Sequence, residues 1–339
     1  MNRNTKRRGR QSYVLPSKPR VKSFAAIAGK KEGEGPFGAD FDIVISDDTL
    51  GEKSWERAES RMLEDVIRLC LEKKDLLAEG VDAFLGGDLL NQIVSASFAA
   101  RQLGMPFLGL YGACSTMAES LLIGSMLIDG GFAQNVVCAT CSHFSTAERQ
   151  YRFPLEMGSV RPPYAQWTVT GAGATALTAE QNHPIAIESL TLGAVVDYNQ
   201  NDENNMGAAM APAAADTLRR HLTEMNRSAD YYDLIVTGDL GRVGQALFEE
   251  LCADHKIELK GRYMDCGSEI FAPEQNLYAG GSGCGCSAVV LNGKLLKEME
   301  RGERRRMLFM ATGALLSPTT TLQGESIPGI AHAVSLEVC

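Results

Sequence analysis

Two hydrophobic periodicities alternate along this chain. Apolar side chains recur every fourth residue at Ala58, Met62, Val66 and Cys70, which is the spacing of a helix that buries one face. The following run, residues 82–89, is short and apolar, ends in a Gly-Asp-Leu tripeptide, and predicts a buried strand. Because helix-like and strand-like segments continue to alternate, the sequence predicts the α/β class, with enough apolar residues for a large core.

The chain also repeats itself. Residues 82–89 (Asp-Ala-Phe-Leu-Gly-Gly-Asp-Leu) return as residues 233–240 (Asp-Leu-Ile-Val-Thr-Gly-Asp-Leu). A second echo links residues 171–177 with residues 283–289, two segments of small residues that favour close packing. Repeated segments in the same order indicate a duplicated unit. We therefore expect two similar halves that meet near residue 182.

The net charge of −9 hides an asymmetry. Residues 1–31 carry ten Lys or Arg and no acid, which leaves 23 basic and 42 acidic residues and a charge of −19 on the remainder. Such a segment is either a solvated, partly disordered terminus or a contact for an anionic membrane surface. Aromatic residues other than Tyr13 do not interleave with the charges, so we expect no nucleic-acid partner. The predicted parts are a basic arm (1–35) and two halves (36–181 and 182–339).

The cysteines indicate an intracellular protein. Their number is odd at nine, and most lie in apolar runs, which predicts reduced, buried thiols. Cys138 and Cys141 have a metal-like spacing, but positions three apart on a strand point to opposite faces. Cys284 and Cys286 would share a face, and we expect core thiols there too. We expect no metal site and no cofactor. Apolar stretches fall short of the roughly 20 residues of a membrane span, so the protein should be soluble or peripheral.

Cys114 is the candidate for chemistry. Residues 105–111 predict a buried strand, residues 112–116 (Gly-Ala-Cys-Ser-Thr) a tight turn, and residues 117–128 a helix. A turn of this kind presents one side chain at the top of a sheet. The N-terminus of the following helix stabilises an anion and lowers the pKa of a thiol. The local sequence therefore predicts the geometry of a reactive cysteine.

These features resemble a known family. A cysteine on a strand-to-helix turn, with Gly-rich and Ala-rich strands in both halves, resembles the thiolase superfamily and its condensing enzymes of the β-ketoacyl synthase III type. Longer strings look like the family of stage V sporulation protein AD. They are residues 112–116, 146–150, 210–217, 280–284, 311–318 and 325–328. The resemblance runs from about residue 36 to the end and does not include the basic arm.

The resemblance implies a fold, a ligand and a location. It implies a five-layer αβαβα fold that binds dipicolinate (pyridine-2,6-dicarboxylate) as this compound is loaded into the developing spore. The expected partners are other spore-membrane proteins of the dipicolinate channel, and the expected location is peripheral to the inner spore membrane, with a link to germination. Superfamily relatives commonly dimerise through a strand near the nucleophile, for which residues 135–139 are the candidate edge. Whether the ligand arrives as the free dianion or as its calcium chelate is left open.

The sequence argues against condensation chemistry. Condensing enzymes of this type pair the cysteine with a histidine and an asparagine. In this chain the register places Gly238 at the histidine position and Ser268 nearest to the asparagine position, and no Gly-His-Pro motif is present. Because loss of members of a concerted triad costs orders of magnitude in rate, we expect no catalytic residues and treat Cys114 as a vestigial nucleophile. The alternative is an acyltransferase that recruits His143 or His332, and a scaffold with an empty pocket is a third class.

If the active-site pocket is kept while its catalytic partners are lost, we expect the pocket to bind a ligand without catalysis. Two carboxylates need N–H donors or cations, and a pyridine ring needs an apolar slot. We expect the ligand near Cys114, Ser115, Ser142, His143 and Gly283, where backbone amides, hydroxyls and an imidazole are available.

Arg149 completes the predicted ligand set. Its guanidinium would make a bidentate contact with a carboxylate if it points inward. The competing interpretation is an ion pair with Glu148, Glu156 or another surface acid.

Overall fold

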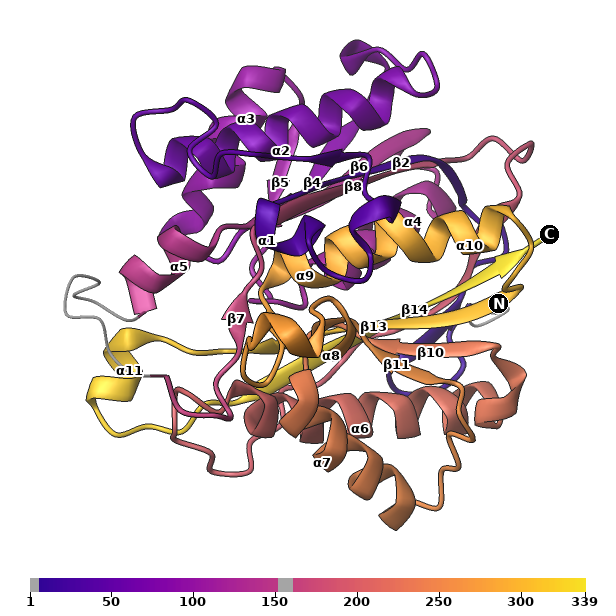
Figure 1. Ribbon diagram of the computed structural model, residues 1–339. Helices are drawn as coiled ribbons and strands as arrows, with labels where there is room; N and C mark the ends of the chain where they lie inside the picture. The colour runs from indigo at the N-terminus through magenta and orange to yellow at the C-terminus, as the bar shows by residue number, and fades with distance from the viewer. Residues whose placement is uncertain (1–5, 152–160) are drawn as a thin grey trace.

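The computed structural model describes residues 6–151 and 161–339 (Figure 1). The strands that build the first half are β2 (Arg20–Ala28), β4 (Ala83–Gly87), β5 (Phe107–Gly109), β6 (Asn135–Ser142) and β8 (Gly171–Thr178). The strands that build the second half are β9 (Ile185–Thr191), β10 (Leu234–Thr237), β11 (Tyr263–Asp265), β13 (Arg306–Ala314) and β14 (Gly329–Val338). The short strands are β1 (Ser12–Val14), β3 (Ile43–Val44), β7 (Trp167–Thr168) and β12 (Gly281–Ser282).

The helices flank these strands. Those of the first half are α1 (Lys30–Gly33), α2 (Trp55–Glu72), α3 (Val94–Leu103), α4 (Thr116–Asp129) and α5 (Phe144–Tyr151). Those of the second half are α6 (Met206–Met225), α7 (Gly241–Asp254), α8 (Cys266–Glu269), α9 (Cys284–Val290), α10 (Leu296–Glu300) and α11 (Pro318–Leu322). Within the described residues, no helix combines the length and the apolar character needed to cross a membrane.

The two halves have the same strand order. The sheet runs β5-β4-β6-β8-β2 through the first half and β11-β10-β13-β14-β9 through the second. In each half the first pairings, β4 with β5 and β6, and β10 with β11 and β13, are parallel, and the remaining pairings are antiparallel. This identity of order and direction confirms the prediction of two similar halves. The position of their boundary, placed near residue 182, stays a prediction.

The helices form three layers around the two half-sheets (Figure 1). Helices α2 and α3 cover the outer face of the first half, and α6 and α7 cover the outer face of the second. Helix α4 packs on β6 from one half and on β13 and β14 from the other, with α9 beside it, so these two helices form the middle layer. The α/β class and the five-layer arrangement predicted from sequence are confirmed.

The basic arm was predicted wrongly. Residues 20–28 form β2, which lies in the middle of the sheet and is mostly buried. The preceding segment is also attached, because the Glu224 carboxylate accepts hydrogen bonds from the backbone N–H groups of Arg10, Gln11 and Ser12. The charges misled the interpretation because several of them, Lys6, Lys18 and Lys22, form ion pairs with acids from distant segments. One of them, Lys22, is 3.0 Å from Glu180.

The predicted dimer edge was also wrong. Residues 135–139 belong to β6, which is hydrogen-bonded on both sides, to β4 and to β8. The strand at the free edge of this half is β5, and its Leu108 side chain is 48% exposed. A strand whose N–H and C=O groups are already paired on both sides cannot add a second copy.

Candidate functional site

A strained turn places Cys114 at the head of α4. Ala113 adopts a left-handed conformation with φ of 50°, which is uncommon for a residue with a side chain. Two short hydrogen bonds hold the turn: Ser115 Oγ donates to the carbonyl of Gly112 at 2.6 Å, and Thr116 Oγ1 donates to the carbonyl of Ala113 at 2.7 Å. The predicted order of strand, turn and helix around this thiol is confirmed, but the strand is not the buried one predicted over residues 105–111: β5 is short and lies at the exposed edge of the sheet.

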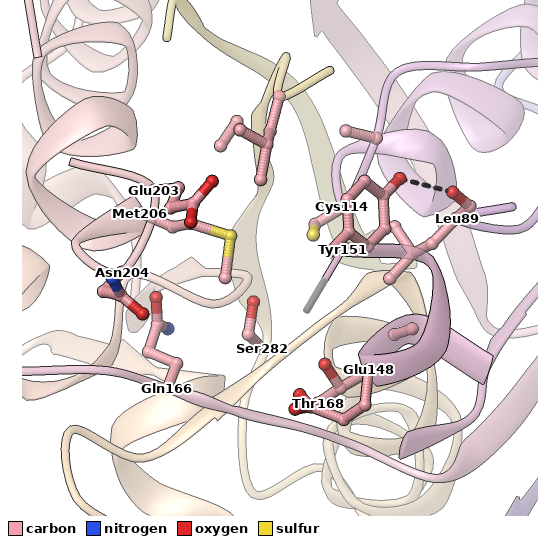
Figure 2. Close-up of a pocket in the computed structure, with 14 residues that line it drawn as sticks. Leu89, Cys114, Glu148, Tyr151, Gln166, Thr168, Glu203, Asn204, Met206 and Ser282 are labelled. Carbon is pink, nitrogen blue, oxygen red and sulfur yellow. Dashed lines mark hydrogen bonds between the residues drawn. The ribbon is translucent and has the colours of Figure 1, made fainter. Parts of the chain in front are cut away.

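Cys114 lines a cavity between the two halves (Figure 2). The first half contributes Leu89 from the end of β4, the Cys114 turn, and the end of α5 with Tyr151. The second half contributes the segment before α6, the Ser282 strand and the end of β13. The described residues of the lining are Leu89, Ala113, Cys114, Ala147, Glu148, Tyr151, Gln166, Thr168, Glu203, Asn204, Met206, Ser282, Ala314 and Leu316.

Asp239 is the group that faces the thiol from the second half. Its carboxylate is buried and accepts hydrogen bonds from Thr312 Oγ1 at 2.7 Å, from Ser282 Oγ at 3.0 Å and from the backbone N–H of Gly283 at 2.9 Å. Burial raises the pKa of Asp239, and hydrogen bonds from Thr312 and from Cys114 lower it in part. The acid therefore contacts the thiol from the second half.

The thiol is not activated. Burial raises the pKa of Cys114 well above its ordinary value, and the charge of Asp239 raises it further. The expectation that the N-terminus of α4 lowers this pKa was wrong, because desolvation and a neighbouring carboxyl outweigh the helix dipole. At neutral pH the side chain is a thiol rather than a thiolate.

No histidine lines the cavity, and all five in the chain lie among the described residues. Two of them were named as surrogate bases. The Nε2 of His143 is 2.8 Å from the carbonyl of Asp48, and the Nδ1 of His332 accepts from the backbone N–H of Gly193. Neither side chain reaches the thiol, so the surrogates proposed for an acyltransferase are wrong.

Position 238 has no room for a side chain. A Cβ on Gly238 would lie 3.0 Å from the Cα of Ala311 and 3.0 Å from the N of Thr312, which is tighter than ordinary contacts. The residue that contacts the thiol is the next one, Asp239. The Gly-Asp-Leu repeat was the signal for it, since the same tripeptide ends β4 in the first half.

Ser268 is likewise not the partner of the thiol. Its backbone N–H donates to Asp265 Oδ2 at 2.9 Å and its hydroxyl donates to the Asp265 carbonyl at 3.0 Å, so it belongs to the capped first turn of α8 and is not in the described lining of the cavity. Ser282 lines the cavity instead, and its hydroxyl is already donated to Asp239.

Most of the predicted ligand residues lie beside the cavity rather than in its wall. Of the six, Cys114 alone is in the described lining. Ser115 bonds within its own turn, while Ser142 donates to the carbonyl of Val169 at 2.7 Å. Gly283 contributes through its backbone N–H, which supports Asp239.

Arg149 forms an ion pair with a surface acid, as the competing interpretation of the sequence predicted, and does not point into the cavity. Its guanidinium forms an ion pair with Glu56 and lies 5.4 Å from the ring centroid of Trp55, on an exposed surface. The acid is a different one from those considered, and Glu156 lies outside the described residues.

The cavity wall carries acids. Glu148 and Glu203 line it, and in the described lining there is no lysine, arginine or histidine. The nearest cation that the structure pairs with this wall is Arg161, 2.5 Å from Glu148 in a largely buried ion pair. The guanidinium of Arg161 lies 5.0 Å from the ring of Trp167 and 5.2 Å from that of Phe144, which stack on each other. Sequence reasoning missed this cation because it is brought to the wall only by folding.

The cysteine pair on β6 behaves as its spacing predicts. Cys138 packs in the central core and donates to the Ser120 carbonyl, whereas Cys141 packs in the outer core near Glu59. The two thiols thus point to opposite faces of the strand. Across residues 6–151 and 161–339, no group of three or more Cys, His, Asp or Glu side chains is arranged to hold a metal ion.

Solved structures share this fold at low sequence identity. The chain aligns with 3-oxoacyl-[acyl-carrier-protein] synthase III from Aquifex aeolicus with a TM-score of 0.59, at 13% identity over 94% of this chain and 99% of that one. Cerulenin-bound OleA from Xanthomonas campestris gives a TM-score of 0.62, at 14% identity over 96% and 97%. Human mitochondrial 3-ketoacyl-CoA thiolase gives 0.59, at 13% over 96% and 99%. These likenesses show a thiolase-like fold.

The sequence itself is closer to a sporulation protein. The family model for stage V sporulation protein AD matches residues 9–337. The curated stage V sporulation protein AD of Bacillus subtilis (strain 168) is 45% identical over 329 residues, which is 97% of each chain. The match begins within the basic segment, which agrees with the presence of that segment in the fold. The chain therefore belongs to the stage V sporulation protein AD family.

Proposed function

We propose that this protein binds dipicolinate in the Cys114 cavity, without catalysis, during loading of the developing spore. The observation that carries the proposal is that a buried acid, and no imidazole, contacts the thiol. A thiolase-like cavity is kept between the halves, but the group facing the thiol is Asp239 and no histidine lines the wall. Membership of a sporulation family supports a spore-related role.

The cavity offers a flat ligand an apolar slot with polar ends. Leu89, Met206 and Leu316 supply apolar wall, and Thr168 places a hydroxyl near Glu148 (Figure 2). The hydroxyls of Thr168 and Tyr151 and the amide of Gln166 line the same cavity and are the polar groups nearest to hand for a ligand carboxylate.

The acidic residues of the cavity wall influence whether dipicolinate binds as the free dianion or as its calcium chelate. Arg161 offsets the charge of Glu148, whereas Glu203 repels a free dianion, and a calcium ion carried by the ligand would offset that charge and take carboxylate oxygens as further ligands. We propose that calcium strengthens binding as part of the chelate.

The proposal extends to assembly. The free edge of the first half is β5, and a second copy would add there by antiparallel strand pairing to give a homodimer. We place the protein at the inner spore membrane as a peripheral partner of the dipicolinate channel proteins.

One observation favours the alternative function, acyl transfer. The strained conformation of Ala113 presents Cys114 as a nucleophile would be presented. Acyl transfer would then require Asp239 to act as the base, because the histidines lie elsewhere.

Equilibrium dialysis with pyridine-2,6-dicarboxylate tests the binding proposal. Wild type should bind saturably at a site that Cys114→Trp and Ala314→Phe both remove, since each fills the cavity from a different wall. Leu77→Trp, at a position 72% exposed and outside the lining, is the matched control and should bind as wild type does. Each variant is first checked for a native circular dichroism spectrum. Persistence of the full binding capacity in both filled, folded variants would overturn the proposal, and added calcium should raise the affinity of wild type.

A further inference from the structure

A second hollow lies in the outer layer of the second half, between α6 and α7. It shares no described lining residue with the Cys114 cavity. We call it the α6–α7 groove. Its lining residues are Val196, Tyr198, Pro212, Ala215, Asp216, Arg219, Arg220, Leu251 and His255.

The groove has more positive than negative charge. Arg219 and Arg220 both turn to the same carboxylate oxygen of Asp216, at 2.5 Å and 3.4 Å. The Nε atom of Arg220 is buried and makes no hydrogen bond. His255 adds a third basic side chain from the end of α7. One carboxylate thus serves two guanidiniums, which leaves a hydrogen-bond donor and a net positive charge for an incoming anion.

The rest of the groove is apolar. Tyr198 is 66% exposed, and Val196 and Leu251 lie on the opposing walls. A large exposed aromatic side chain next to the unsatisfied Nε of Arg220 suits a ligand that has both a flat apolar face and a carboxylate. An inorganic anion would satisfy the arginines and leave Tyr198 uncovered.

We propose that the α6–α7 groove is a second binding site, which takes a small carboxylate carried on a flat apolar ring. The carboxylate pairs with Arg220 and Arg219 in competition with Asp216, and the ring lies on Tyr198. This site is independent of the function proposed for the Cys114 cavity, because the two share no wall.

Isothermal titration of the full chain with pyridine-2,6-dicarboxylate as the probe tests this proposal. Wild type should show a binding event that Arg220→Gln weakens about tenfold, the effect of losing one charge-assisted hydrogen bond. Asp216→Asn should strengthen the same event, because it removes the competing carboxylate, and structural damage would not have this effect. Arg68→Gln, which breaks an exposed ion pair with Glu64 on α2, is the matched control and should change nothing.

The outcomes separate the two sites. Cys114→Trp should leave the groove event intact, whereas Arg220→Gln should leave the cavity event intact. Unchanged titrations for both Arg220→Gln and Asp216→Asn would overturn the second site and leave the cavity proposal standing. Inorganic phosphate should compete only weakly for the groove, and competition as strong as that of the dicarboxylate would overturn the assigned ligand class.

Discussion

Asp88 and Asp239 occupy equivalent places in the two halves and perform different tasks. Each follows a glycine at the carboxyl end of the second strand of its half, β4 or β10. Asp88 turns back on its own chain and accepts from the backbone N–H groups of Leu90 at 2.8 Å and Ala96 at 2.7 Å. Asp239 instead bonds to groups from other segments and to the thiol across the interface.

The comparison shows that equivalent residues of a duplicated fold can stabilise a loop in one half and contribute to the candidate site in the other. In the first half the acid secures the loop after β4 and the start of α3, and the wall residue Leu89 lies in that loop. In the second half Thr312 and the segment before α9 donate to the acid, which contacts the Cys114 thiol instead of its own loop. The tripeptide is the same, and its surroundings set the role.

The largest effect expected is on stability, from Asp88→Ala. This change leaves two buried N–H groups without acceptors, at a cost of roughly 1–3 kcal/mol each, so the free energy of unfolding should fall by about 3 kcal/mol. Urea denaturation followed by circular dichroism measures it. Asp82→Ala, an exposed acid that caps a neighbouring turn, is the control and should cost less. A loss no larger than that of the control would show that Asp88 is not the structural member of the pair.

A second buried acid of the first half should appear in the pH dependence of stability. Burial raises the pKa of Glu32 to about 8, although its carboxylate accepts from the backbone N–H of Thr170 at 3.0 Å. The folded state then holds a proton that the unfolded state releases near pH 4.5, so this group lowers the free energy of unfolding as pH rises from about 5 to 8.

Glu32→Gln should remove this contribution. Relative to wild type, the variant should gain roughly 1 kcal/mol in unfolding free energy for each pH unit between 5 and 8. Urea denaturation at pH 5, 6.5 and 8 gives the comparison. A constant difference across these pH values would mean that Glu32 ionises in the fold as it does in water.

Asp239→Asn should have the smallest effect on stability and a specific effect on the thiol. The amide fits the same space and keeps an acceptor for Thr312, but its NH2 group cannot accept from the backbone N–H of Gly283, so the unfolding free energy should fall by about 1–2 kcal/mol. Because the carboxylate charge raises the pKa of Cys114, its removal should lower that pKa and speed alkylation by iodoacetamide several-fold. Peptide mass mapping identifies the alkylated cysteine. An unchanged alkylation rate at Cys114 would show that the charge of Asp239 does not affect the pKa of the thiol.

Local patterns predicted the parts of this protein that local forces determine. The turn at Cys114 and the opposite directions of Cys138 and Cys141 follow from residue types and from strand periodicity. The repeat of residues 82–89 at 233–240 predicted the equivalence of the halves, but residues 283–289, expected to be a strand like residues 171–177, form helix α9, so that part of the prediction was wrong. Strand β2 was missed because the basic residues at its start looked like a solvated tail, while their neutralising acids come from distant segments.

The site was harder to predict because it depends on register and on contacts between segments. Gly238 and Asp239 differ by one position in register, and the sequence alone does not tell which of them contacts the thiol. The close packing of β13 against Gly238 leaves little space for a side chain there. His143 and Arg149 follow β6 in sequence, but a backbone carbonyl at Asp48 and a carboxylate at Glu56 hold them away from the cavity. Such partners lie far along the chain and cannot be recognised from spacing.

The central claim is that the Cys114 cleft has lost condensing chemistry. Intact-mass spectrometry after incubation with acyl-CoA tests this most directly, with Cys114→Ala as the blank. Because burial and Asp239 keep the side chain as a thiol and no imidazole reaches it, we predict an unmodified mass for wild type. An acyl adduct that forms on wild type and is absent from Cys114→Ala would contradict the account and establish a working transferase.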